Sequence, residues 1–264
     1  MRLLATLAAS ILVPLLPLAA QSTQTLIIPQ IADGGAWQTT LVLANTTTTS
    51  ALVSLNFYEE TTGGATESWS LSFLEAVSLQ NLPLAPGATM FLHTPGTAST
   101  TAVGWGQLQA PAGVVCYAIF TQRVTGRPDQ DGTAPATAGT TRVLVPFDNS
   151  SNAVTSIALA NPSNAAESVL VSIQTDAGAI TQQTPLNIPA MGHTAFAFPV
   201  QFPATSGQRG LAEFYTAAGS LSIIGLRFNP TGGFTASPAY AETGSPIIGA
   251  NGSTPGKSAS SARN

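Results

Sequence analysis

Residues 29–45 have the sequence PQIADGGAWQTTLVLAN, and residues 146–161 follow the same pattern as PFDNSSNAVTSIALAN, with one residue gapped. Both stretches end on an asparagine, at Asn45 and Asn161. Further matches occur in the same order along the chain: 53–57 (VSLNF) with 169–173 (VLVSI), and 86–91 (PGATMF) with 190–196 (AMGHTAF). A repeat of about 110 residues has the size of a whole domain and is too long for a solenoid unit. The sequence therefore predicts an internal tandem duplication.

Within each repeat, apolar residues alternate with polar ones. Val53, Leu55 and Phe57 are apolar at every second position, and 68–73 (SWSLSF) continues the pattern. Strict alternation places one face of an antiparallel sheet in a core and the other in water. Turn signals such as Asp33-Gly34-Gly35 separate these runs. We therefore expect an all-β fold of two tandem antiparallel β-sandwich domains.

Composition divides the chain into five parts. Residues 1–22 are expected to be a signal peptide, because Arg2 precedes an apolar run that is too short, at about 16 residues, for the roughly 20 that a membrane span needs. The other expected parts are repeat 1 at 23–125, a Gly/Pro/Thr/Ala-rich linker at 126–141, repeat 2 at 142–240 and a disordered tail at 241–264. We expect a secreted, periplasmic or cell-surface protein with no membrane span after signal cleavage.

Two stretches carry a resemblance to a known kind of repeat. Residues 31–45 (IADGGAWQTTLVLAN) and 225–235 (GLRFNPTGGFT) resemble the start and the end of a repeat found in secreted, functionally uncharacterised bacterial proteins. The resemblance covers nearly all of 26–240, but repeat 2 has Asp148-Asn149-Ser150-Ser151 in place of the glycines and Ala153 in place of the tryptophan. It implies exported, tandem Ig-like sandwiches, and it implies no activity.

The charge content excludes one class of function. Only 8% of residues are Asp, Glu, Lys or Arg, against about 25% in an average soluble protein, and the formal net charge is −4. The basic side chains between the signal peptide and the tail are scattered arginines: Arg123, Arg127, Arg142, Arg209 and Arg227. Nucleic-acid binding needs a clustered basic surface, so we expect no nucleic-acid partner.

Cys116 is the sole cysteine, so the chain has no intramolecular disulfide. It lies in the apolar run 114–120 (VVCYAIF) and is expected to be a small core residue. Without a disulfide, each sandwich is expected to be stable from its own core, which about 100 residues can provide.

The candidates for catalysis and metal binding are few. His93 and His193 are the only histidines, and no Gly-x-Ser-x-Gly or His-Glu-x-x-His motif accompanies them. Both are therefore expected to be surface or strand-end residues without a catalytic partner. Glu59-Glu60 is expected to be a solvated hairpin shoulder, because consecutive strand residues point to opposite faces.

Two acidic turns leave calcium binding open. Asp129-Gln130-Asp131-Gly132 resembles part of a calcium loop, but Thr140 stands where the twelfth-position glutamate of such a loop would be. Aspartate also favours turns through bonds to its own backbone, and the same alternatives apply to Asp33. A turn is favoured at both places, so we expect no cofactor and no metal site.

All three tryptophans, Trp37, Trp69 and Trp105, lie in repeat 1. Trp69 is in phase with Leu71 and Phe73 and is expected in the core. Trp37 and Trp105 have no aromatic counterpart in repeat 2, so each is either core or an exposed platform for a sugar or a partner.

The function that these observations favour is an exported, non-catalytic β-sandwich module for cell-surface, envelope or extracellular interaction. Its partner would be a protein or a polysaccharide at the cell surface. One alternative is a carbohydrate-binding protein that uses Trp37 and Trp105 as ligand-binding residues. A second alternative is a secreted hydrolase, which needs a site that the sequence does not display.

Overall fold

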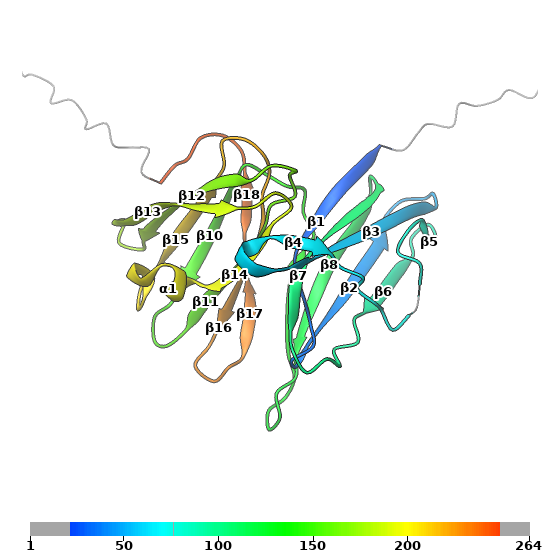
Figure 1. Cartoon of the computed structure of the whole chain (residues 1–264), viewed down its shortest axis with the longest axis horizontal. Helices are drawn as coiled ribbons and strands as arrows, with labels where there is room; N and C mark the ends of the chain where they lie inside the picture. The colour runs from blue at the N-terminus through cyan, green and yellow to red at the C-terminus, as the bar shows by residue number, and fades with distance from the viewer. Residues whose placement is uncertain (1–21, 76, 249–264) are drawn as a thin grey trace, which may run out of the picture.

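The computed structural model describes residues 22–75 and 77–248. Almost all of the regular structure is β-strand, and the two halves of the chain form two sandwiches that lie side by side (Figure 1). In the first half the strands are β1 (Thr23–Asp33), β2 (Trp37–Asn45), β3 (Ala51–Glu60), β4 (Thr66–Ser68), β5 (Leu82–Leu84), β6 (Thr89–His93), β7 (Ala102–Pro111), β8 (Val114–Gln122) and β9 (Gln130–Pro135). In the second half they are β10 (Arg142–Asp148), β11 (Val154–Ala160), β12 (Glu167–Thr175), β13 (Ile180–Ile188), β14 (His193–Ala197), β15 (Arg209–Tyr215), β16 (Ser222–Phe228), β17 (Phe234–Ser237) and β18 (Tyr240–Glu242).

The helical turns are short. They are η1 (Thr62–Gly64), α1 (Phe198–Gln201) and η2 (Pro203–Thr205). The prediction of an all-β fold of antiparallel sandwiches is therefore confirmed.

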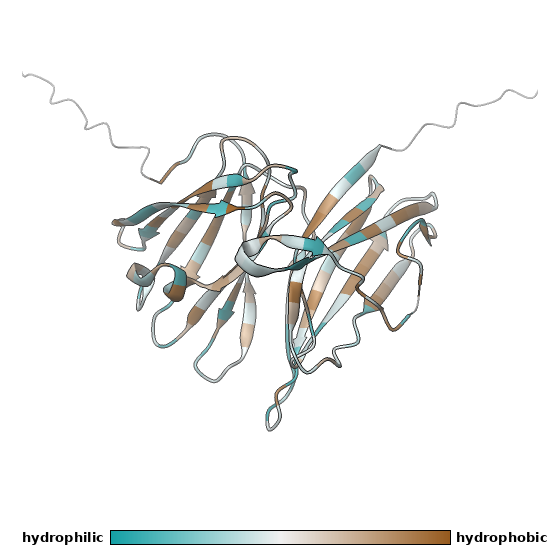
Figure 2. Ribbon diagram, viewed as in Figure 1, coloured by the Kyte–Doolittle hydropathy of each residue, from teal (hydrophilic) through white to brown (hydrophobic). Residues whose placement is uncertain are grey.

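Each half contains two sheets. In the first half the strand orders are β1-β7-β3-β4, with β5 also paired to β3, and β6-β2-β8-β9. In the second half they are β13-β12-β15-β10-β18 and β14-β11-β16-β17. Residue hydropathy alternates along the strands of both sandwiches (Figure 2). In β3, for example, Val53, Leu55 and Phe57 are buried in the core, as the period of two predicts.

Corresponding strands occupy corresponding places in the two halves. The order β6-β2-β8-β9 matches β14-β11-β16-β17 when the strands are taken in chain order. Asn45 and Asn161, which close β2 and β11, are both buried and have the same hydrogen bonds. Each side chain donates to the carbonyl oxygen four residues later and accepts the backbone N–H two residues later. The duplication itself stays an inference from the sequence.

The core of the first sandwich includes residues of the second half. Its buried cluster contains Ala158 of β11, Ile224 of β16 and Phe234 of β17. These residues belong to the sheet β14-β11-β16-β17, whose other face supplies Ile157, Leu159 and Ile223 to the second core. This sheet is therefore apolar on both faces, and the first half does not build its core alone as the sequence led us to expect.

The span 126–141, expected to be a linker, contains a strand. β9 pairs with β8 in register from Gln122↔Gln130 to Tyr117↔Pro135 and completes the outer sheet of the first sandwich. β9 also lies beside β17 of the second half. The physical reason is that Ala134 can enter the first core from this position, where it is 3% exposed.

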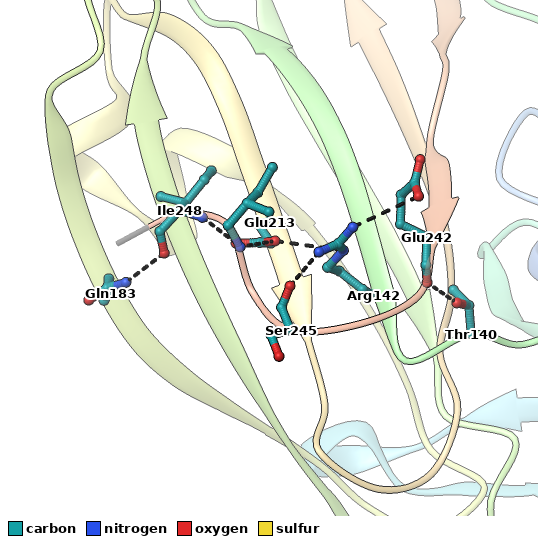
Figure 3. Close-up of polar contacts among 8 residues, drawn as sticks. Thr140, Arg142, Gln183, Glu213, Glu242, Ser245 and Ile248 are labelled. Carbon is teal, nitrogen blue, oxygen red and sulfur yellow. Dashed lines mark hydrogen bonds and ion pairs between the residues drawn. The ribbon is translucent and has the colours of Figure 1, made fainter. Parts of the chain in front are cut away.

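Residues 241–264 were expected to form a disordered tail. This prediction is wrong for residues 241–248, which are ordered. β18 pairs with β10, and a fully buried carboxylate then holds the segment that follows (Figure 3). Glu213 accepts the backbone N–H of Ile247 at 2.9 Å and that of Ile248 at 2.8 Å. Arg142 donates to the Ser245 carbonyl oxygen beside it. Residues 1–21 of the expected signal peptide and 249–264 of the tail lie outside the described residues.

Candidate functional site

Trp105 lies at the junction of the two halves and is 0% exposed. Its ring stacks on Tyr58 with centroids 4.5 Å apart, and its Nε1–H donates to the Met191 carbonyl oxygen at 2.8 Å. Both rings stand on the outer face of the sheet β1-β7-β3-β4, where Tyr58 is the register partner of Trp105. The exposed-platform alternative is therefore wrong for Trp105, because the second half covers that face.

His193 begins β14 and is also 0% exposed at the junction. Its Nδ1 lies 2.6 Å from Glu60 Oε2, and its Nε2 donates to the Pro29 carbonyl oxygen at 3.1 Å. His193 is at a strand end as expected, but it is buried and has a partner, and Glu60 is a hairpin shoulder that is only 23% exposed. The cause is the same for both residues. The buried imidazole of His193 needs hydrogen-bond partners, and the first half supplies them from Glu60 and Pro29.

The protonation of this pair follows from its geometry. A carbonyl oxygen only accepts, so Nε2 must carry a proton. A 2.6 Å contact between Nδ1 and a carboxylate oxygen then requires a second proton between them. The His193–Glu60 pair therefore joins the two halves through a short hydrogen bond.

Two local features bring these groups together. The register of β1 shifts between Ile28 and Ile31, and this bulge contains Pro29, whose carbonyl reaches His193. Gly192 precedes His193, and a Cβ there would stand 2.7 Å from the Gly64 carbonyl oxygen. A glycine at position 192 thus allows the loop of the second half to approach the β3–β4 turn of the first.

Trp37 stands at the start of β2 and is half-buried. Its ring packs against Phe234 of the second half, with centroids 5.4 Å apart. It also lines a hollow of about 290 Å³ between the two sandwiches. Trp37 therefore remains a candidate ligand-binding residue, at the junction and not on an open face. Trp69 is half-buried against the first core, as its phase predicts.

The remaining acidic candidates are engaged within the protein. Asp33 accepts the Gly96 backbone N–H at 2.8 Å, and Asp131 accepts the Thr121 hydroxyl at 2.6 Å. Asp129 pairs with Arg123 at 3.3 Å. Within residues 22–75 and 77–248, no group of three or more His, Cys, Asp or Glu side chains could hold a metal ion.

His93 ends β6 on the surface, as expected, but it has a partner. Its Nδ1 lies 2.6 Å from Glu75 Oε1, and the two side chains are 40% and 30% exposed. Burial raises the pKa of the Cys116 thiol to about 12, which agrees with its expected place in the core.

Two exposed aromatic side chains, with a buried valine between them, lie on the outer face of the sheet β6-β2-β8-β9. Val42 is the register partner of both Phe91 on β6 and Tyr117 on β8, so the three side chains share one face. Phe91 is 48% exposed and Tyr117 39%, whereas Val42 between them is 3% exposed. Neighbouring strands are about 4.8 Å apart, so the backbones of β6 and β8 are roughly 10 Å apart. We call Phe91, Val42 and Tyr117 the aromatic row.

The sequence contained a signal for one of the two aromatic residues of this row, Tyr117. In 114–120 (VVCYAIF), Val114, Cys116 and Phe120 are buried, which leaves Val115 and Tyr117 on the opposite face. Val115 is indeed 49% exposed. Phe91 could not be assigned in the same way, because β6 is only five residues long and its neighbours are of mixed polarity.

Comparison of the chain with protein-family models, curated proteins and solved structures gave no match. In the part of the chain that the structure describes, no helix is long and apolar enough to cross a membrane. The function is therefore argued from the geometry alone.

Proposed function

We propose that the protein is an exported, non-catalytic β-sandwich module that binds an extracellular or cell-surface partner through the aromatic row. The observation that carries the proposal is the pair Phe91 and Tyr117, both large, exposed and on one face. Exposed aromatic side chains of this kind dominate the affinity of binding surfaces.

A polysaccharide fits this face best. The row carries no charge, and its two rings come from strands about 10 Å apart, so an extended chain of sugars could stack on both at once. The carbohydrate-binding alternative thus keeps its ligand but changes its residues. Trp105 is buried, and Phe91 and Tyr117 take the role that this alternative gave to Trp37 and Trp105.

The geometry gives no support to a hydrolase that uses His193. Both of its ring nitrogens are hydrogen-bonded inside the junction, and the ring has no exposed surface. A general base must reach a proton of the substrate, so this imidazole is committed to holding the two halves together.

The test is co-sedimentation of the mature protein with insoluble cellulose, chitin and peptidoglycan. Phe91→Ala and Tyr117→Ala should each weaken binding about 30-fold, the equivalent of about 2 kcal/mol at a hot spot. Tyr240→Ala is the matched control, because Tyr240 is 51% exposed on β18 of the other half. Binding that all three variants retain equally would refute the role of the row. Binding to envelope proteins but to no polysaccharide would assign the row to a protein partner instead.

A further inference from the structure

A second candidate site lies inside the junction, away from the aromatic row. The hollow of about 290 Å³ that Trp37 lines has walls from both halves. The large side chains that line it include the aromatic rings of Trp37, Phe120 and Phe228. The small side chains that line it include Ala32, Ala158, Ala195 and Ala197.

The alanines explain why the sandwiches leave a space. Ser156 and Ala158 of β11 pair with Ala197 and Ala195 of β14, so four small side chains stand together on the outer face of that sheet. The same face carries Leu226 and Phe228 on β16, which pack against the first core. Leu226 and Phe228 therefore hold the two halves in contact on β16, while the small side chains on β11 and β14 leave a space beside them.

Gln30, Thr101 and Ser156 are the polar residues that line the hollow, and Gln30 has an unsatisfied buried atom. It lies in the bulge of β1, is 9% exposed and lines the hollow. Its Nε2 donates to the Ile31 carbonyl oxygen at 3.3 Å, which fixes the orientation of the amide. Its Oε1 is buried and has no hydrogen-bond partner. A buried acceptor without a donor is destabilising, so a ligand that brings a donor would gain affinity here.

We propose that this hollow binds a small, flat, mostly apolar molecule that carries one hydrogen-bond donor. The lining combines the aromatic rings of Trp37 and Phe228 with small alanine side chains, which suits a flat ring. None of the lining residues is Asp, Glu, Lys or Arg, so the ligand is uncharged. The donor pairs with Gln30 Oε1. Pockets between domains, with apolar walls and few polar groups, are the usual form of small-molecule sites.

The proposal is independent of the polysaccharide, since the aromatic row contributes no residue to the hollow. The experiment is calorimetric titration of the full chain with 2-naphthol and with naphthalene, which lacks the hydroxyl donor. We expect one saturable site per chain that prefers 2-naphthol about tenfold, the usual range for satisfying a buried acceptor.

Two variants locate the site. Ala195 is exposed on the rim, so Ala195→Phe should fill the hollow without disturbing the fold and weaken both compounds at least tenfold. Gln30→Leu should keep naphthalene binding and remove the preference for 2-naphthol. Absence of saturable binding, or binding that Ala195→Phe leaves unchanged, overturns the proposal. Equal affinity for both compounds in the unmodified protein overturns the role of Gln30.

Discussion

The two histidines allow a matched comparison of how much a His–Glu hydrogen bond contributes to stability when it is buried and when it is exposed. His193–Glu60 and His93–Glu75 both have an Nδ1 to carboxylate distance of 2.6 Å. The His193 side chain is 0% exposed and that of Glu60 23%, whereas His93 and Glu75 are 40% and 30% exposed. Replacing each histidine by alanine therefore compares the same contact in two environments.

The expected costs differ several-fold. His193→Ala leaves the Glu60 carboxylate and the Pro29 carbonyl oxygen without their partner inside the junction. Removing one member of a buried pair costs about 3–5 kcal/mol, and partial access of water to Glu60 favours the lower end, about 3 kcal/mol. His93→Ala removes a surface pair and should cost less than about 1 kcal/mol.

The assay is urea-induced unfolding followed by tryptophan fluorescence, since Trp105 at the junction reports its opening. Double-mutant cycles with Glu60→Gln and Glu75→Gln separate the pairwise energy from lost packing. We expect a coupling of about 1.5 kcal/mol or more for the buried pair and less than about 0.5 kcal/mol for the surface pair. Equal costs at the two histidines, or no coupling between His193 and Glu60, would refute the reasoning.

Three further expectations concern other parts of the molecule. Burial raises the pKa of Cys116 to about 12, so it should not react with a thiol reagent at pH 8 until urea unfolds the chain. Labelling of the folded protein at the rate of an exposed thiol would contradict this burial. Hydrogen bonds from Ser150 and Arg227 lower the pKa of Asp148 from 3.8 to about 2, so its stabilisation is complete above the unfolded value and is lost as the pH falls toward 2. Because the carboxylate is 26% exposed we expect about 1–2 kcal/mol, and Asp148→Asn should lack this loss in acid melts between pH 4 and 2. Residues 23–141 alone should bind a hydrophobic dye and melt without cooperativity, whereas 23–248 should melt in one transition; a cooperative melt of the shorter chain would show that its core is complete by itself.

The local sequence pattern predicts where strands form. It does not predict what covers each face of a strand. The alternation in 53–57 predicts β3 because it depends only on neighbouring residues. It also places Tyr58 on the outer face of the sheet, but it does not tell whether water or another sandwich covers that face. The burial of Trp105, the register partner of Tyr58 on β7, is decided by contacts with the second half.

The polar partners at the junction were beyond sequence reasoning. Glu60 and His193 are 133 residues apart, and no spacing rule links them. A better signal existed for the interface itself. The run 222–228 (SIIGLRF) is apolar at adjacent positions, which is typical of a strand covered on both faces. The same rule could have predicted that the sheet containing β16 packs against something on each side.

The shared core also determines the order in which the chain can fold. Synthesis proceeds from the N-terminus, so all of β1 to β9 emerges before Ile224 and Phe234 exist. Until then the first sandwich has an uncovered apolar edge, which is prone to association with other chains. Contacts between residues so distant in sequence also slow folding, because loop closure must precede them. We therefore expect the nascent first half to depend on a chaperone, and the last strands of the second half to release it.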